Sequence, residues 1–118
     1  MKIMVLVKAI PNSAAGALEN ERDRAAMDAY NDELVAAGIR LDVGGFRPLS
    51  DGARVDFRGG EARVIDDRSA AAHEHVVGFW IWRVRSMDEA VAWARRCPFP
   101  AGDVCVLELR PFNEQDDH

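Results

Sequence analysis

Apolar residues are densest over residues 76–84, a run of β-branched and aromatic side chains that predicts a strand. Successive side chains of a strand point to opposite faces, so one face carries Val77, Phe79 and Ile81. The other face carries Val76, Trp80, Trp82 and Val84. Because both faces are apolar, we expect other parts of the protein to cover this strand on both sides.

Further runs have apolar residues at strand spacing, over residues 1–8, 39–43, 53–58, 62–65 and 104–109. The first of these is apolar on both faces, whereas the second has one polar face. Gly59 and Gly60 separate the third and fourth runs and favour a tight hairpin turn, so we expect a hairpin appended to the main sheet. Gly44 and Gly45 predict a bulge or a close approach of backbones, and residues 48–52 predict a loop.

Two other segments have apolar residues at helical spacing. The first has an apolar face made of Met27, Tyr30 and Leu34. Asn20 is placed to cap the start of this helix, and Gly38 is placed to end it in a left-handed conformation. The second helix begins at a capping box formed by Ser86 and Glu89, and Pro98 stops it.

The order strand–helix–strand, hairpin, strand–helix–strand predicts a ferredoxin-like α+β fold, with an antiparallel sheet and both helices on one face. Two helices cover only one face, yet the strands over residues 1–8 and 76–84 are apolar on both. A second copy packed against the open face would cover it, so we expect a homodimer. In this arrangement Trp80 and Trp82 belong to the core of the dimer.

The chain of 118 residues has room for one core, and we expect a single domain over residues 1–112 with an acidic tail over residues 113–118. The net charge of −5 argues against a nucleic-acid partner, because a phosphate backbone is bound by basic surfaces. No apolar run approaches the ~20 residues of a membrane span, and residues 1–10 lack the features of a signal peptide. We therefore expect a cytoplasmic protein in which Cys97 and Cys105 are small buried residues.

Short segments spread over nearly the whole chain carry a resemblance to a known family. They are residues 1–7, Tyr30-Asn31-Asp32-Glu33-Leu34, Ala36-Ala37-Gly38, Gly52-Ala53-Arg54-Val55, Gly78-Phe79-Trp80, Asp88-Glu89-Ala90 and Arg96-Cys97-Pro98. In their order and spacing they resemble the YCII-related domain family, in its DGPF-type branch. The resemblance implies a dimeric α+β barrel. It also implies either isomerase- or dehydrochlorinase-like chemistry on small ring compounds, with a His/Asp pair in a cleft, or a regulatory role beside alternative sigma factors.

The sequence departs from this family at two places. Where the branch has its namesake Asp-Gly-Pro-Phe motif, this chain has Asp66-Asp67-Arg68-Ser69, so only Asp66 is retained. The histidine that the broader family has on the first helix is missing, since residues 21–37 contain no histidine. The His/Asp pair of the relatives therefore cannot be assigned to that helix.

Residues 66–75 gather polar side chains directly before the apolar strand, where a site would lie if the protein has one. Asp66 and either His73 or His75 are the candidate catalytic residues, because imidazole carries protons near neutral pH and a partly buried carboxylate can do so. The alternatives are that Asp66 caps a turn and that the histidines are exposed in a loop. In an extended segment both histidines could bind one metal ion, but the ligands fall short of a zinc or iron site, and we expect no metal.

Arg47 and Arg68 are candidate ligand-binding residues, because a guanidinium binds a carboxylate through two parallel hydrogen bonds; surface ion pairing is the alternative. Trp80 is a candidate surface for stacking a flat ligand. The chain has no phosphate-binding loop, dinucleotide fingerprint or nucleophile elbow, and we expect no cofactor. Two functions follow: an isomerase- or lyase-like acid/base enzyme for a small molecule, or a non-catalytic ligand-binding or regulatory module linked to sigma-factor-dependent transcription.

Overall fold

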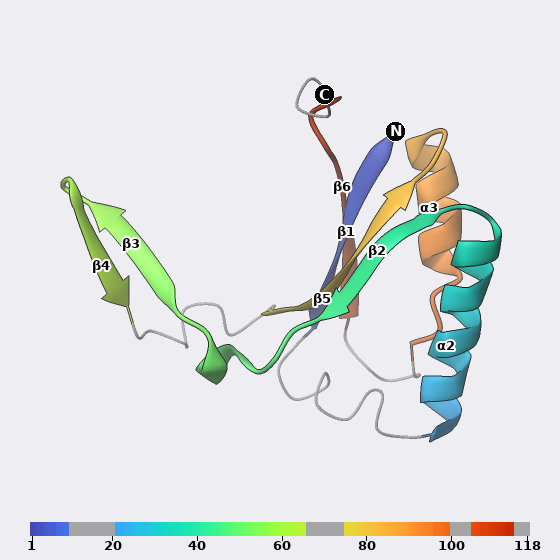
Figure 1. Ribbon diagram of the computed structural model, residues 1–118, viewed down its shortest axis with the longest axis horizontal. Coiled ribbons are helices and arrows are strands. Elements are labelled where there is room, and N and C mark those ends of the chain that lie inside the picture. The colour runs from blue at the N-terminus through green and yellow to red at the C-terminus, as the bar shows by residue number, and fades with distance from the viewer. Residues whose placement is uncertain (10–20, 66–74, 100–104, 115–118) are drawn as a thin grey trace.

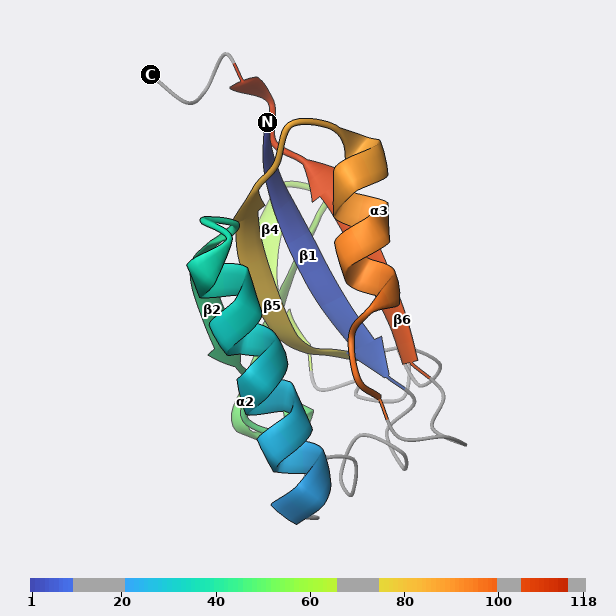
Figure 2. The same ribbon diagram turned by 90° about the vertical axis from the view of Figure 1, so that its right-hand side faces the viewer.

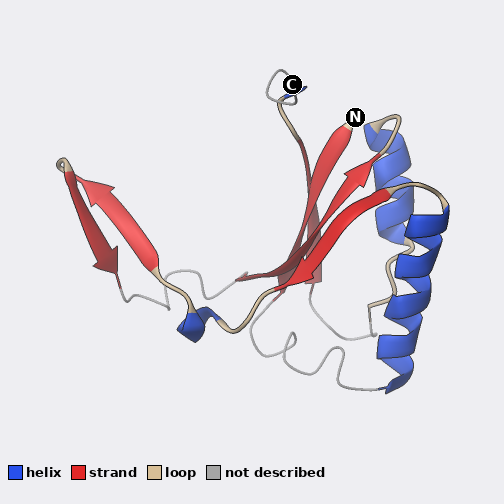
Figure 3. Cartoon of the chain, viewed as in Figure 1, coloured by secondary structure: helices blue, strands red, loops and turns tan. Residues whose placement is uncertain are grey.

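The computed structural model describes residues 1–9, 21–65, 75–99 and 105–114 of the 118-residue chain (Figure 1). Its elements are β1 (Lys2–Ala9), α2 (Glu21–Ala36), β2 (Arg40–Gly45), the 3-10 helix η1 (Leu49–Asp51), β3 (Arg54–Arg58), β4 (Glu61–Ile65), β5 (His75–Arg83), α3 (Met87–Arg95) and β6 (Cys105–Pro111). Every predicted strand and both predicted helices are therefore present, as the colouring by secondary structure shows (Figure 3).

Four strands form one antiparallel sheet in the order β2-β5-β1-β6, so the two strands that are apolar on both faces, β1 and β5, lie at its centre. Both α2 and α3 pack on one face of this sheet (Figures 1 and 2). We call the face away from these helices the open face. This strand order with one helix layer is a ferredoxin-like α+β fold, as predicted.

Both ends of α2 follow from local sequence signals. Glu21 and Asp23 lie in the first turn, where the positive end of the helix dipole favours carboxylates. The helix ends before Gly38, which has a φ of 73° and so takes the left-handed conformation predicted for it. The N–H of Ile39 then donates to the carbonyl of Leu34 at 2.9 Å, which leads the chain directly into β2.

The predicted capping box of α3 is right for one residue and wrong for the other. The Ser86 hydroxyl accepts from the N–H of Glu89 at 3.1 Å, as predicted. The Glu89 carboxylate accepts from the N–H of Arg85 at 2.7 Å, one residue before the predicted donor. This bond, together with the bond from the Arg85 guanidinium, lowers the pKa of Glu89, so the carboxylate that fixes the helix start stays ionised.

The hairpin of β3 and β4 is a separate two-stranded antiparallel sheet. Gly59 and Gly60 connect the strands with φ values of 61° and 84°, which a two-residue hairpin turn requires and which other residues rarely adopt. The predicted hairpin is thus confirmed. The loop predicted over residues 48–52 instead contains η1, in which the N–H of Asp51 donates to the carbonyl of Pro48 at 2.9 Å.

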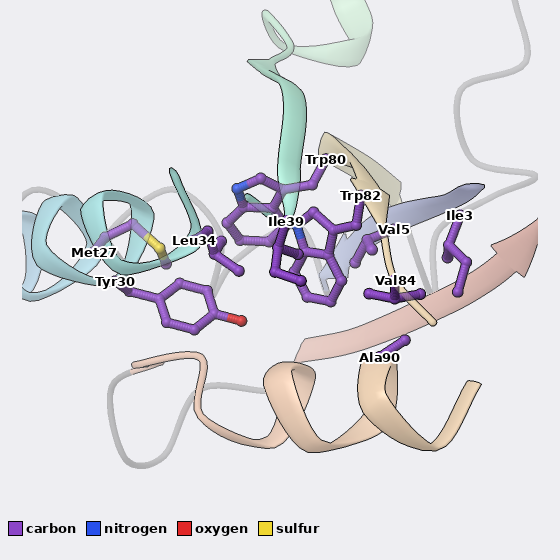
Figure 4. Close-up of a cluster of buried hydrophobic side chains, with 10 residues drawn as sticks. All are labelled: Ile3, Val5, Met27, Tyr30, Leu34, Ile39, Trp80, Trp82, Val84 and Ala90. Atoms are coloured by element: carbon purple, nitrogen blue, oxygen red, sulfur yellow. The ribbon is translucent and has the colours of Figure 1, made fainter. Parts of the chain in front are cut away.

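The hydrophobic core lies between the sheet and the two helices (Figure 4). Its largest fully buried side chains are Trp82, Ile3, Leu34 and Val5. Trp80 is also buried, so both tryptophans of β5 pack within one chain, on the face that α2 and α3 cover. The prediction that Trp80 and Trp82 form the core of a dimer is therefore wrong, because the chain's own helices cover the face that they share.

The expected distribution of β5 side chains is also wrong for Val76. Between Val7 and Lys8 the pairing of β1 with β5 shifts by one residue, and Val76 lies opposite Lys8. Because Lys8 belongs to the open face, Val76 falls on that face and not on the face of Trp80. Its side chain is 39% exposed in the single chain, which agrees with this position.

Replacing Leu34 by alanine should lower the free energy of unfolding by about 3 kcal/mol, because a fully buried leucine would leave a cavity between α2 and the sheet. The matched control is Val35→Ala on the exposed side of the same helix, which should cost less than about 0.5 kcal/mol. Urea denaturation followed by tryptophan fluorescence measures both changes. Equal losses for the two variants would contradict this core.

Candidate functional site

Three strands meet at the end of the sheet that the predicted catalytic segment joins. His75 is the first residue of β5 and pairs with Ala9 of β1, which pairs in turn with Cys105 of β6. We call the end of the sheet at which His75, Ala9 and Cys105 lie side by side the site end. In sequence, residues 66–74 lie between the end of β4 at Ile65 and the start of β5 at His75. The other predicted residues of this segment lie outside the described residues: Asp66, Arg68 and His73.

Strand β2 leads Arg47 to the same end of the sheet. The N–H of Phe46 donates to the carbonyl of Val77 at 2.9 Å, which continues the antiparallel pairing of β2 with β5 past the last residue of β2. Arg47 is the next residue of the chain after this contact. Its side chain is 84% exposed, and Nε lies 3.3 Å from Oδ2 of Asp51. Because an exposed ion pair is weak, this guanidinium can exchange its partner for another anion.

Trp80, the third predicted ligand-binding residue, is buried in the core beneath α2. Its indole N–H donates to Oδ1 of Asn31 at 2.7 Å, and its ring meets that of Tyr30 edge-on with 5.9 Å between centroids. The Asn31 amide also donates to the carbonyl of Met27 at 3.1 Å. Sequence reasoning missed Asn31, although a polar residue directly after the core residue Tyr30 was a signal. The stacking of a ligand on Trp80 stays a prediction.

Tyr30 links the two helices. Its hydroxyl donates to the carbonyl of Trp93 near the end of α3 at 2.7 Å. Burial raises the pKa of Tyr30, and the nearby thiol of Cys97 raises it further. The phenol therefore stays protonated at neutral pH and serves as a hydrogen-bond donor between α2 and α3 rather than as a base.

Two stacked aromatic rings lie beside the site end. The rings of Phe46 and Phe79 are 5.8 Å apart with an angle of 26° between their planes. A Cβ on Gly44 would lie 2.6 Å from the Phe79 ring, and a Cβ on Gly78 would lie 2.9 Å from the carbonyl oxygen of Gly44. The close approach of backbones predicted from Gly44 is thus confirmed, and it makes room for the Phe79 ring over β2.

The open face carries both apolar and charged side chains, and Lys2, Asp42, Arg83 and Arg110 are among the charged ones. The register of the strands places on it Met4, Leu6, Val76, Phe79, Ile81 and Val106. Lys8 and Glu108 lie among these residues, with 3.0 Å between Nζ and Oε1. The bonds from Lys8 and Arg110 lower the pKa of Glu108, so this carboxylate stays ionised and satisfied by its neighbours. The open face therefore combines partly exposed apolar side chains, of which Val76 and Val106 are the most exposed, with charged side chains, of which Lys8 and Glu108 are paired.

The two cysteines do not have the properties of a nucleophilic site. Cys97 is partly buried, and burial together with the Cys105 thiol raises the pKa of Cys97 to about 12. Because the thiolate is the reactive form, Cys97 is a poor nucleophile at neutral pH. Among the described residues, no group of three His, Cys, Asp or Glu side chains is arranged to hold a metal ion.

A sequence profile of the YCII-related domain matches residues 1–113 of this chain. The chain therefore belongs to the YCII-related domain family, in agreement with the resemblance of its short segments. Among curated proteins no significant match is found. The narrower assignment to the DGPF-type branch stays a prediction. Within the described ranges, each helix is too short or too polar to cross a membrane.

Iodoacetamide should label Cys97 in the native protein at least about a hundredfold more slowly at pH 8 than in urea, because the raised pKa leaves little thiolate. The native rate should rise about tenfold for each pH unit between pH 8 and 10. Mass spectrometry of peptides after timed quenching separates the labelling of Cys97 from that of Cys105. A native rate equal to the rate in urea would show that the thiol is not protected.

Proposed function

We propose that this YCII-related protein is a homodimeric enzyme that moves protons on a small organic molecule, in the manner of an isomerase or a lyase. The observation that carries the proposal is the strand pairing at the site end. It leads Arg47 to the strand that begins at His75, and the segment containing Asp66 and His73 joins that same strand. Arg47 and His75, which are distant in sequence, thus come at one end of the sheet; that Asp66, Arg68 and His73 join them there is part of the proposal.

Each candidate residue has a distinct role in this proposal. Arg47 and Arg68 bind a carboxylate of the substrate, for which a planar guanidinium is well shaped. Asp66 and one of His73 or His75 act as the acid and the base, because imidazole both accepts and releases protons near pH 7. The two charges of the arginines also stabilise negative charge that develops when a proton leaves the substrate.

The dimer is proposed through the open face. Its apolar side chains are partly exposed in the single chain, which is unfavourable in water, and a second copy related by a two-fold axis presents the same face to cover them. Phe46 and Phe79 lie where the open face meets the site end. A flat apolar part of the substrate could rest against these rings, with the sheet of the second copy close by.

A non-catalytic ligand-binding or regulatory module is the second candidate, and one observation favours it. In the described ranges, the resolved pKa shifts are upward for Tyr30 and Cys97 and downward for Glu89 and Glu108. All four shifts lead away from neutrality, so none of these groups is tuned for proton transfer at pH 7. On this reading the dimer binds a small effector, and the resemblance to the DGPF-type branch would connect it to sigma-factor-dependent transcription.

Val106→Glu should raise the dissociation constant of the dimer at least about a hundredfold, because two added carboxylates would lose their hydration in the interface. Val106 is 43% exposed in the single chain and pairs with Lys8, so a glutamate is tolerated in the monomer. The control is Val35→Glu on the outer side of α2, which should leave the dimer unchanged. Sedimentation equilibrium measures both constants, and equal values would contradict a dimer formed through the open face.

Small aromatic carboxylates that bind the site end should raise the melting temperature by about 5 °C at ten times their dissociation constant. Asp66→Asn and His75→Gln should reduce this shift or abolish turnover of the bound compound. Asp32→Asn, on the exposed side of α2, is the control and should change neither. Thermal denaturation with a panel of such acids, followed by product analysis, makes the test.

The pattern of results separates the two candidates. Suppose that the wild-type protein converts one of the acids. If His75→Gln then loses this turnover but keeps the thermal shift, the result supports proton transfer. A thermal shift without any product supports the non-catalytic module. If no acid of the panel gives a shift, or if Asp66→Asn and Asp32→Asn behave alike, the proposed site end is wrong.

A further inference from the structure

The hairpin of β3 and β4 has one apolar face that is exposed to water. Its cross-strand pairs on that face are Val55 with Val64 and Phe57 with Ala62. The Phe57 and Val64 side chains are 77% and 76% exposed. The opposite face carries charged residues, among them an ion pair of 2.8 Å between Arg58 Nε and Asp56 Oδ2. The hairpin is therefore amphipathic, although the single chain covers neither of its faces.

A two-stranded hairpin is only marginally stable in water and normally needs packing against another layer. This hairpin projects from the rest of the chain (Figure 1). In agreement with this shape, the radius of gyration of 16.1 Å exceeds the ~13.5 Å expected for a compact chain of this length. The missing layer must come from a surface outside the compact body of the same chain.

The position of the hairpin indicates where that surface lies. In Figures 1 and 2 the hairpin stands on the opposite side of the main sheet from α2 and α3. It therefore extends on the side of the open face. A body packed against the open face would lie between the main sheet and the hairpin. Phe46, which is 54% exposed, lies at the beginning of the connection from β2 to the hairpin and joins the two apolar surfaces.

The size of the open face also calls for a second contact surface. A spacing of about 4.8 Å between strands and a rise of about 3.3 Å per residue give four strands of this length a face of roughly 480 Å². Stable protein interfaces bury about 800 Å² on each partner. The flat area of the open face is about 60% of this value, and the apolar face of the hairpin is additional surface on the same side.

We propose that the β3–β4 hairpin is an arm that clasps a second copy of this chain, with Val55, Phe57 and Val64 packed against the partner. This inference rests on the proposed dimer through the open face and extends it: each copy both receives an arm and supplies one. The charges of the arm fit such a partner, because the hairpin strands carry three arginines and two acids while the whole chain has a net charge of −5. Removing the arm contacts weakens the dimer without touching the core beneath α2 and α3.

Phe57→Ser tests the arm directly, with Arg63→Ser on the charged face of the same hairpin as the matched control. Sedimentation equilibrium should show a dissociation constant raised at least about tenfold for Phe57→Ser and changed less than about twofold for Arg63→Ser. The melting temperature and circular dichroism at a concentration where all variants are monomeric should match the wild type. As a second measurement, p-benzoylphenylalanine in place of Phe57 should cross-link two chains under light.

The outcomes separate the arm from the dimer on which it rests. Weakened dimerisation by Phe57→Ser and an intermolecular cross-link support the arm. If Val106→Glu disrupts the dimer but Phe57→Ser does not, and cross-links form only within one chain, the proposed arm is overturned and the proposed dimer stands. A wild-type protein that is monomeric at every concentration overturns both. Cross-links from position 57 to lipid vesicles or to another protein, without cross-links between copies of this chain, also overturn the proposed arm.

Discussion

The packing of the β5 tryptophans beneath the two helices is the contact on which the rest of the structure depends. Trp80 and Trp82 lie on one face of the central strands with Ile3, and Leu34 of α2 and Ala90 of α3 close over them. Because both helices are needed to cover these large side chains, neither is left for the opposite face. The open face and the projecting hairpin are consequences of this division.

The polar groups within this layer hold the helices in place and take no part in the proposed chemistry. Asn31 fixes the Trp80 indole, and the Tyr30 hydroxyl reaches the carbonyl of Trp93 on the other helix. In the described part of the chain, the Trp82 indole nitrogen is the buried side-chain polar atom that has no partner. The hydrogen bonds of Asn31 and Tyr30 therefore belong to the core between the sheet and the helices and not to the proposed site.

Much of the fold could be predicted because its signals are local. Gly38, Gly59 and Gly60 each adopt the positive φ that their positions in the pattern required, and apolar spacing located every strand. The errors concern relations between elements. A pattern that is apolar on both faces cannot say which face the helices choose, so Trp80 was assigned to the wrong layer. A one-residue shift of register moved Val76 to the open face for the same reason.

The candidate site was predictable in its residue types but not in its assembly. Residues with suitable chemistry, such as Arg47 and His75, can be chosen from the sequence. That both lie toward one end of the sheet depends on the antiparallel register of β2 and β5, which only the structure supplies. Asn31 was missed because a polar residue on a helix is normally expected to face water. Asp66, Arg68 and His73 lie outside the described residues and keep the status of predictions.

Gly44 of β2 and Gly78 of β5, where the two strands approach closely, affect which substitutions this protein tolerates. A side chain at Gly78 would meet the main chain of Gly44, and a side chain at Gly44 would meet the Phe79 ring. The separation between the strand leading to Arg47 and the strand starting at His75 is thus a property of peptide geometry. Substitutions that loosen the interior can therefore lower stability while this spacing between the strands is retained.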